Sequence, residues 1–343
     1  MFKDYLKKTY PVYLLYLLFV LCTFVVLMIC QMISDLIIYM LSLYFSIILL
    51  YFLLDYRKYK QHHQYLIYLK DNPELFDNLP QESYLEEKMY QEIENVAHEY
   101  QDIEGIALSM PGAVDSDGGI IYGSSAIDYI HGPNIKEDLK QRLNKDVEFE
   151  NDANCAALAE VWKGVACHEN DCCFIVSGTG IGGAVIKDRH VHHGNALHGG
   201  EFGYMIMRYD QDEKRYYTWS DDGSTVAVTK RVAKELGVDY HTLDGKEVFD
   251  QADNNEVYKK YVDEYYRTLA MGIYNLQYAY DPSMIIIGGA ISSRSDLLDK
   301  VNEQLDIIFS QLTHAHVRPN IKVCQFGNDA NLIGATYHYI QRH

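Results

Sequence analysis

The residues best suited to chemistry stand together at 150–154, where the sequence reads Glu-Asn-Asp-Ala-Asn between an expected strand and an expected helix. A carboxylate here, with Asp152 as the candidate, lies near helix N-terminal amides and can accept a proton from a substrate hydroxyl. The alternative is structural, because Asp and Asn are also preferred helix N-caps. Spacing alone does not separate the two interpretations.

Two glycine-rich turns are candidates for nucleotide binding. In the turn at 177–183 (SGTGIGG), glycines let the backbone N–H groups of Gly178, Thr179 and Gly180 approach phosphate oxygens. No Gly-Lys-Ser/Thr ends it and no strand–helix context surrounds it, so it is neither a Walker loop nor a dinucleotide fingerprint. A hairpin turn that binds nothing is the alternative. Gly288 and Gly289 follow an apolar strand and form a turn flat enough for a purine.

A histidine-rich segment leads into His-Gly-Gly-Glu at 198–201. Four histidines within residues 190–198 suggest zinc, but the next cysteine after Tyr204 is Cys324, so no thiolate cluster completes a site. We therefore predict no metal site. Glu201, which follows two glycines, is a candidate for hydrogen bonding to a polyol.

Strands and helices alternate around these residues, which indicates an α/β fold. The pattern predicts strands at 103–110, 147–149, 173–177, 183–186 and 284–287, and helices at 154–166, 225–236 (with Ser224 as N-cap) and 257–280.

Composition separates this part of the chain from what precedes it. The 343 residues carry 30 basic and 48 acidic side chains, a net charge of −18, which argues against nucleic acid as a partner. All 23 glycines lie at or after Gly105, as expected for two unlike modules joined end to end. The seven cysteines do not suggest a disulfide framework.

We predict three domains: a two-helix hairpin at 1–60, a helical linker at 61–101, and the α/β domain at 102–343.

The first domain reads as a transmembrane hairpin in contact with the lipid bilayer through residues 11–54. Residues 9–34 and 36–54 lack Asp, Glu, Lys and Arg, and each run supplies the roughly 20 apolar residues that a helical span needs. Lysines precede the first run and Arg57, Lys58 and Lys60 follow the second, which predicts a cell-membrane protein with two spans and both termini cytoplasmic. Two buried helices of a soluble core are the alternative.

Residues 81–100 read as an amphipathic helix with Leu85, Met89, Ile93 and Val96 on one face. The first 90 residues resemble the sensor end of intramembrane-sensing (bacitracin-type) histidine kinases, through the hairpin and DYRKYKQHHQYLIYLK at 55–70. That family's phosphoacceptor His precedes Lys-Thr-Pro, whereas His98 precedes Glu-Tyr-Gln, so histidine kinase activity is not implied.

The soluble part resembles the ROK (repressor, open reading frame, kinase) family of bacterial sugar kinases and repressors. Six ordered blocks carry the resemblance: SMPGAVD at 109–115, ENDANCAALAE at 150–160, SGTGIGGAVI at 177–186, HGGEFGY at 198–204, IIIGGAIS at 285–292 and NDANLIGA at 328–335. The resemblance implies a two-lobed actin/hexokinase-like (ribonuclease H-like) fold, in which a sugar and ATP meet in the cleft between the lobes and Mg²⁺ lies between the phosphates.

The resemblance also implies roles for individual residues. Asp152 would be the catalytic base that deprotonates a hexose hydroxyl, usually the 6-hydroxyl. Asn151, Glu201 and the loop of Pro111 and Gly112 would hold the other hydroxyls. Gly178, Thr179 and Gly180 would face the phosphates of ATP, and Gly288 and Gly289 the adenosine.

Two family features are missing. Tyr204 replaces the zinc-binding His of Gly-Glu-x-Gly-His and the accompanying cysteines are absent, so no structural zinc is expected. No glycine precedes Gly105, so the N-terminal Asp-x-Gly-Gly-Thr phosphate loop, which helps to hold Mg²⁺, is also lost. The lobe would then lack its first strands, although residues 84–101 could still supply its first helix.

Three hypotheses follow: a membrane-tethered ATP-dependent hexose kinase (hexokinase/glucokinase-like), a catalytically impaired sugar or nucleotide sensor, or a non-functional fusion. Sugar-responsive repression is disfavoured because no helix-turn-helix precedes the domain. Glucose, a β-glucoside and an N-acetylhexosamine all remain open as the sugar, and a homodimer is compatible with the sequence.

Overall fold

The computed structural model describes residues 81–100, 102–123 and 127–343. The chain divides into two compact units, residues 1–89 and 90–343, and the second holds every residue assigned a chemical role above. Both predicted membrane spans lie outside the described residues. Within the described part, no helix is both long and apolar enough to cross a membrane. The transmembrane hairpin and the sensor resemblance therefore stay predictions.

Helix α5 (Gln81–Glu99) forms where an amphipathic helix was predicted, but its buried face differs from the predicted one. Val96 is 58% exposed, whereas Tyr90 and Ala97, seven residues apart and so on one helix face, are buried. The phenol of Tyr90 donates to Asp138, and the guanidinium of Arg142 lies over its ring. The contacts of the Tyr90 ring with helix α6 (Ile135–Leu143) thus determine which face of α5 is buried. The predicted apolar face was wrong at Val96.

Two parallel strands, β1 (Gly105–Met110) and β4 (Asp146–Asn151), pair in register with Met110 opposite Asn151. Their carboxyl ends therefore lie side by side at one edge of the sheet. Within the described residues β4 is the only strand that pairs with β1. A short hairpin of β2 (Ala113–Asp115) and β3 (Ile120–Tyr122) follows β1.

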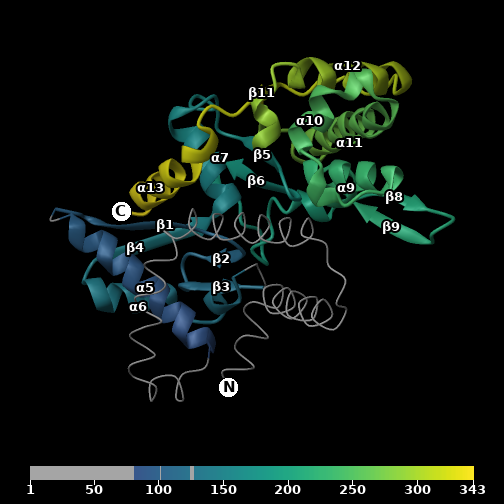
Figure 1. The fold of residues 1–343 in the computed structure, drawn as a ribbon. Helices are drawn as coiled ribbons and strands as arrows, with labels where there is room; N and C mark the ends of the chain where they lie inside the picture. Colours follow the sequence, from purple (N-terminus) through teal and green to yellow (C-terminus); the bar gives the residue numbers. More distant parts are fainter. Residues whose placement is uncertain (1–80, 101, 124–126) are drawn as a thin grey trace, which may run out of the picture. The chain divides into compact units, whose positions relative to one another are not determined.

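A five-stranded sheet forms the centre of the other part of this unit (Figure 1). Its order is β11-β10-β5-β6-β7. Strands β11, β10 and β5 are parallel to one another, β6 runs antiparallel to β5, and β7 runs antiparallel to β6. The strands are β5 (Cys172–Ser177), β6 (Ile181–Lys187), β7 (His190–Val191), β10 (Met284–Gly288) and β11 (Ile321–Val323). The hairpin of β8 (Ile206–Asp210) and β9 (Arg215–Thr218) is separate from this sheet.

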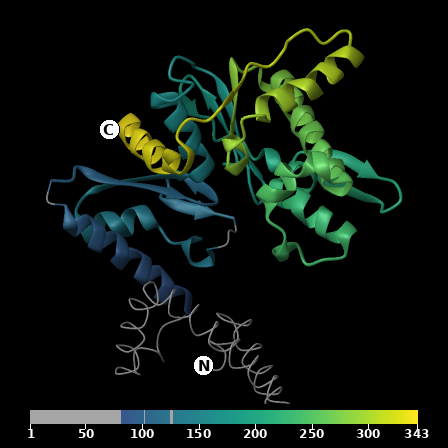
Figure 2. The same ribbon diagram turned by 45° about the horizontal axis from the view of Figure 1, so that its top comes forward.

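Alternate side chains of β5 and β10 enter two different hydrophobic cores, as strand geometry requires. Cys173 and Ile285 join one core, and Phe174 and Ile286 the other. The first core lies under helices α9, α11 and α12, and the second lies against α7 and α13 (Figure 2). The remaining helices are α7 (Asp152–Lys163), α8 (Trp219–Gly223), α9 (Thr225–Leu236), α10 (Gly245–Asp250), α11 (Glu256–Tyr280), α12 (Leu297–Gln311) and α13 (Ala330–Arg342), with short 3-10 turns at Asp128–Ile130, Phe202–Tyr204, Tyr240–Thr242, Ala252–Asn254, Ala290–Ser293 and Gly327–Asp329.

Helices α7 and α13 join the two sheets, because α13 packs on β1, β4 and α7, while α7 packs on β5 and β6. Gly334 allows the close crossing of the two helices, since a β-carbon there would come within 1.7 Å of the Cys155 carbonyl oxygen. The helix pair fixes the β4–α7 junction that carries Asp152.

Candidate active site

The junction between β4 and α7 brings two of the predicted sugar-binding groups together. The Asn151 side-chain oxygen caps α7 by accepting hydrogen bonds from the N–H groups of Ala153 and Asn154, at 2.9 and 3.2 Å. Its amide nitrogen donates to the Gly112 carbonyl oxygen at 3.1 Å. Asn151 is therefore the helix cap that the structural interpretation required, and it also ties the loop of Pro111 and Gly112 to the junction.

Asp152 is the first residue of α7 and is exposed. One carboxylate oxygen accepts from the N–H of Ala153 at 2.8 Å. The helix N-terminus favours a negative charge at this position. The carboxylate thus faces solvent instead of packed hydrocarbon, as a base that meets a substrate hydroxyl must.

The turn of Gly178, Thr179 and Gly180 joins β5 to β6. A β-carbon on Gly178 would meet no atom within 4 Å, and Thr179 is exposed. Within the described residues the backbone N–H groups of Thr179 and Gly180 have no hydrogen-bond partner. The Gly178 carbonyl accepts from the Thr225 hydroxyl at 2.9 Å, so the turn is attached to the first residue of α9. Open space beside unpaired N–H groups suits an anionic ligand such as a phosphate.

The second glycine pair lies beside the first. Gly289 follows β10 with a φ of +87°, and a β-carbon there would come within 2.3 Å of the Ser177 carbonyl oxygen. Ser177 ends β5, and its hydroxyl accepts a 3.0 Å hydrogen bond from the buried Tyr265 phenol. The glycine turn at 178–180 and the turn of Gly288 and Gly289 therefore lie at the carboxyl ends of the parallel strands β5 and β10, where open α/β sheets bind ligands.

The loop at 192–204 runs from the β4–α7 junction to the glycine turn. At one end, Nε2 of His193 lies 2.6 Å from a carboxylate oxygen of the fully buried Glu150. At the other, a β-carbon on Gly203 would come within 2.1 Å of the Ile181 carbonyl oxygen. Glu201 lies between them, half-buried, and among the described residues its carboxylate has no hydrogen bond or ion pair. It is free to bind a hydroxyl group.

The charge of Glu150 is held by its neighbours. Burial raises the pKa of this carboxyl, but the hydrogen bond from His193 and the charges of His193 and His338 outweigh burial and bring the pKa below its usual value. The same hydrogen bond raises the pKa of His193. The sequence did not reveal this pair, because Glu148 and Glu150 alternate with apolar residues along β4 as solvent-facing residues do. Both are buried.

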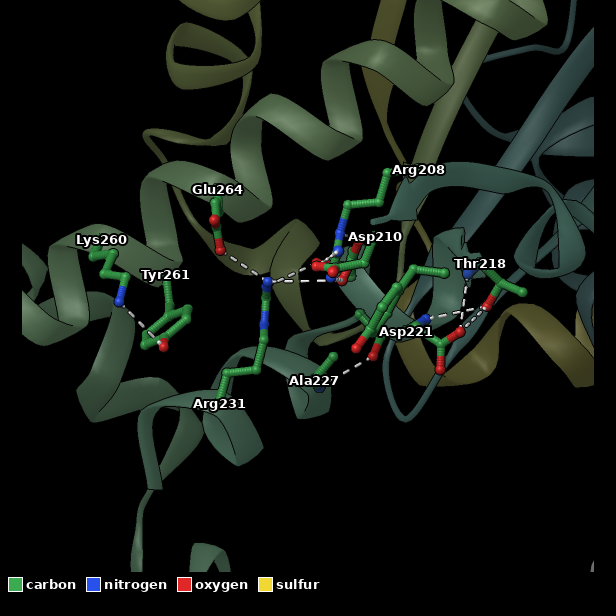
Figure 3. Close-up of polar contacts among 12 residues, drawn as sticks. Arg208, Asp210, Thr218, Asp221, Ala227, Arg231, Lys260, Tyr261 and Glu264 are labelled. Atoms are coloured by element: carbon green, nitrogen blue, oxygen red, sulfur yellow. Dashed lines mark hydrogen bonds and ion pairs between the residues drawn. The ribbon is translucent and has the colours of Figure 1, made fainter. Parts of the chain in front are cut away.

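An ion network holds the β8–β9 hairpin and the start of α9 in place (Figure 3). Asp222, only 4% exposed, accepts from Nε of Arg208 at 2.6 Å, and its backbone carbonyl accepts from Arg231 at 2.9 Å. The Arg231 guanidinium lies 2.8 Å from the Glu264 carboxylate and 3.8 Å from that of Asp222, and Figure 3 shows it between Glu264 and the Arg208 side chain. Because Arg231 lies on α9, this network supports the helix to which the glycine turn is attached.

Tyr204, which the sequence predicted to replace a zinc-binding His, is 74% exposed. The part of the chain that the structure describes contains no group of three or more His, Cys, Asp and Glu side chains that could hold a metal ion. The absence of structural zinc stays a prediction.

Comparison with known proteins identifies the family. The ROK family model matches residues 76–342. The chain belongs to the ROK family. The match includes α5, in the segment interpreted as a linker.

Two curated ROK-like relatives are sugar kinases by name. A β-glucoside kinase of Klebsiella pneumoniae is 33% identical over 240 residues, which cover 69% of this chain and 78% of the relative. A glucokinase of Halalkalibacterium halodurans is 30% identical, with 68% and 75% covered. Among solved structures, a ROK family protein from Streptococcus pneumoniae in complex with sucrose is 34% identical, with a TM-score of 0.69 and 75% and 86% covered. The predicted actin/hexokinase-like ROK sugar kinase fold is thus confirmed.

Proposed function

We propose that this ROK protein phosphorylates a hexose with ATP, at the 6-hydroxyl of a glucose-like sugar. The observation that carries the proposal is the exposed carboxylate of Asp152 beside Asn151, which is itself bonded to the Gly112 loop. The loop at 192–204 then connects this junction to the open glycine turn. The sugar kinase names of the relatives support the same reaction class.

The described residues fit ATP at the glycine turns. Thr179 and Gly180 offer unpaired N–H groups to phosphate oxygens, and Gly288 and Gly289 form a turn without side chains for the adenosine. The phosphate loop that would help to hold Mg²⁺ is missing from the sequence, and we assign no residue as a magnesium ligand. ATP would supply the phosphoryl group, and Mg²⁺ would neutralise its charge.

The chain's own residues orient and deprotonate the sugar. Asn151, Glu201 and the Gly112 loop would hold hydroxyls so that the 6-hydroxyl meets Asp152. Asp152 takes the hydroxyl proton as the bond from O6 to the γ-phosphorus forms and the bond to the β,γ-bridging oxygen breaks, which releases ADP. The products are a sugar phosphate, ADP and a proton.

A second candidate is a sugar or nucleotide sensor without turnover, favoured by the lack of any glycine before Gly105 and so of the Asp-x-Gly-Gly-Thr phosphate loop. A non-functional fusion is the third.

Titration of the full chain with hexoses, β-glucosides and ATP separates the candidates. A kinase consumes ATP only when sugar is present, a sensor binds without turnover, and a fusion without a working site does neither. In the kinase, Asp152→Asn should lower kcat by about 100-fold or more, because general base catalysis contributes about 10²–10⁴-fold. Since Asp152 is exposed, Tm should hardly change. Full sugar-dependent ATP consumption by this variant would contradict the assigned base.

We also propose that residues 11–54 anchor the kinase to the cell membrane as two spans with both termini cytoplasmic. The charge-free runs and the flanking basic residues support this proposal. In membranes washed with alkaline carbonate, the full chain should stay in the pellet. Release of the chain into the wash would contradict an integral hairpin.

A further inference from the structure

Glu150 is a fully buried carboxylate whose hydrogen bonds reach the sugar side of the site. One oxygen accepts from the Asn151 N–H at 2.7 Å and from the Asn154 side-chain amide at 2.9 Å. These two bonds fix the junction that presents Asn151 and Asp152. A buried charge is costly unless a partner compensates it, so the group that faces the other oxygen matters for the whole junction.

That group is His193, whose Nε2 lies 2.6 Å from the second oxygen of Glu150. The backbone carbonyl of His193 also accepts a 2.8 Å hydrogen bond from the Gly199 N–H, two residues before Glu201. Gly199 packs closely here, since a β-carbon on it would come within 2.1 Å of the His192 carbonyl oxygen. Residue 193 thus ties the loop that carries Glu201 to the junction that carries Asp152.

We propose that His193 is a positioning residue that, through its ion pair with Glu150, fixes Glu201 relative to Asn151 and Asp152 so that all three can hold one sugar. The inference rests on the proposed function. His193 contacts no reacting atom in this scheme and acts through Glu150 and the loop.

Titration of His193 then affects sugar binding. Other titratable or charged groups surround the pair. Helix α13 contributes His338, which lies 3.7 Å from Glu150, and Arg342, which pairs with Glu148. The others are Asp117 between β2 and β3, Glu148 on β4, and Lys136 on α6, which also pairs with Glu148. Because the hydrogen bond to Glu150 raises the pKa of His193 above its ordinary 6.5, the ion pair is complete below 6.5 and weakens as pH rises through the raised value. The KM for sugar should rise over the same interval.

The test compares His193→Gln with His192→Gln in the full chain reconstituted in nanodiscs. His192 is the exposed neighbour, and within the described residues its side chain makes no hydrogen bond, ion pair or ring contact. His193→Gln should raise the KM for sugar about tenfold while kcat and the KM for ATP stay within about twofold, because a positioning contact to the sugar side is lost. The alkaline rise in the KM for sugar should persist in His192→Gln and vanish in His193→Gln.

A double-mutant cycle of Glu150→Gln and His193→Gln, read as Tm without sugar or ATP, measures the ion pair independently. The combined variant should lose less Tm than the sum of the single variants. Additive losses would overturn the ion pair, and a lowered Tm with an unchanged KM for sugar would leave His193 a purely structural role and overturn the proposal. A wild-type chain that consumes no ATP with any hexose would contradict the proposed function, whereas the ion pair would still be decided by the cycle.

Discussion

Gly289 lies against Ser177 so closely that a β-carbon on residue 289 would come within 2.3 Å of the Ser177 carbonyl oxygen. The φ of +87° at Gly289 is also one that side chains with a β-carbon rarely adopt. The two residues hold together the ends of the neighbouring strands β10 and β5, and so the two glycine turns proposed to bind ATP. Gly289 is therefore needed for the packing of these strands, whereas a glycine that faces open space is needed only where a ligand binds.

Gly289→Ala should therefore lower the free energy of unfolding by about 1–3 kcal/mol, because the new methyl group meets the backbone at a strained φ. Gly178→Ala is the matched control, since the added carbon meets no atom within 4 Å. It should leave Tm unchanged and raise the KM for ATP, because the methyl group occupies the space proposed for phosphate. Equal losses of Tm in the two variants would contradict this division.

Local patterns in the sequence predicted most elements but not the pairing of distant groups. Helix α9 begins and ends where the pattern placed it, with Ser224 as its cap, because capping and periodicity are local signals. Glu150 was predicted only as part of a strand-end motif. Its partners lie 43 residues away at His193 and on α13 at His338, and no local pattern reveals such contacts. Val96 was misplaced because Tyr90 and its contacts to α6 determine the buried face of α5.

The network around Arg231 should contribute to stability. The almost fully buried carboxylate of Asp222 pairs with both Arg208 and Arg231, and Asp222→Ala removes it. The free energy of unfolding should therefore fall by about 3 kcal/mol. Asp212→Ala, at the exposed tip of the same hairpin, should change it by less than about 0.5 kcal/mol. Chemical denaturation of both variants measures the difference. A loss for Asp212→Ala as large as that for Asp222→Ala would show that the network has no special role.

Cysteine reactivity should follow burial. Burial raises the pKa of Cys172 and of Cys173 to about 12, so fewer than about one of these thiols in a thousand is ionised at pH 8. Cys167 and Cys324 are only half-buried. Iodoacetamide at pH 8 should therefore label Cys167 and Cys324 well before the adjacent pair, as measured by peptide mass spectrometry of the native chain. Labelling of the pair at the same rate would contradict its place at the start of β5.

Acid should remove the stability that Glu150 provides. The hydrogen bond from His193 and the nearby charges outweigh burial and lower its folded pKa, so the carboxylate stabilises the fold above its ordinary value of 4.5. That contribution is lost as pH falls through the lowered value. The Tm of wild type should therefore exceed that of Glu150→Gln near pH 6, and the difference should shrink below pH 4.5. Glu303→Gln, an exposed carboxylate of α12, controls for the general effect of acid and should track wild type throughout. A difference between wild type and Glu150→Gln that stays constant into acid would mean that folding does not lower the pKa of Glu150, and the ion pair with His193 would then lose its basis.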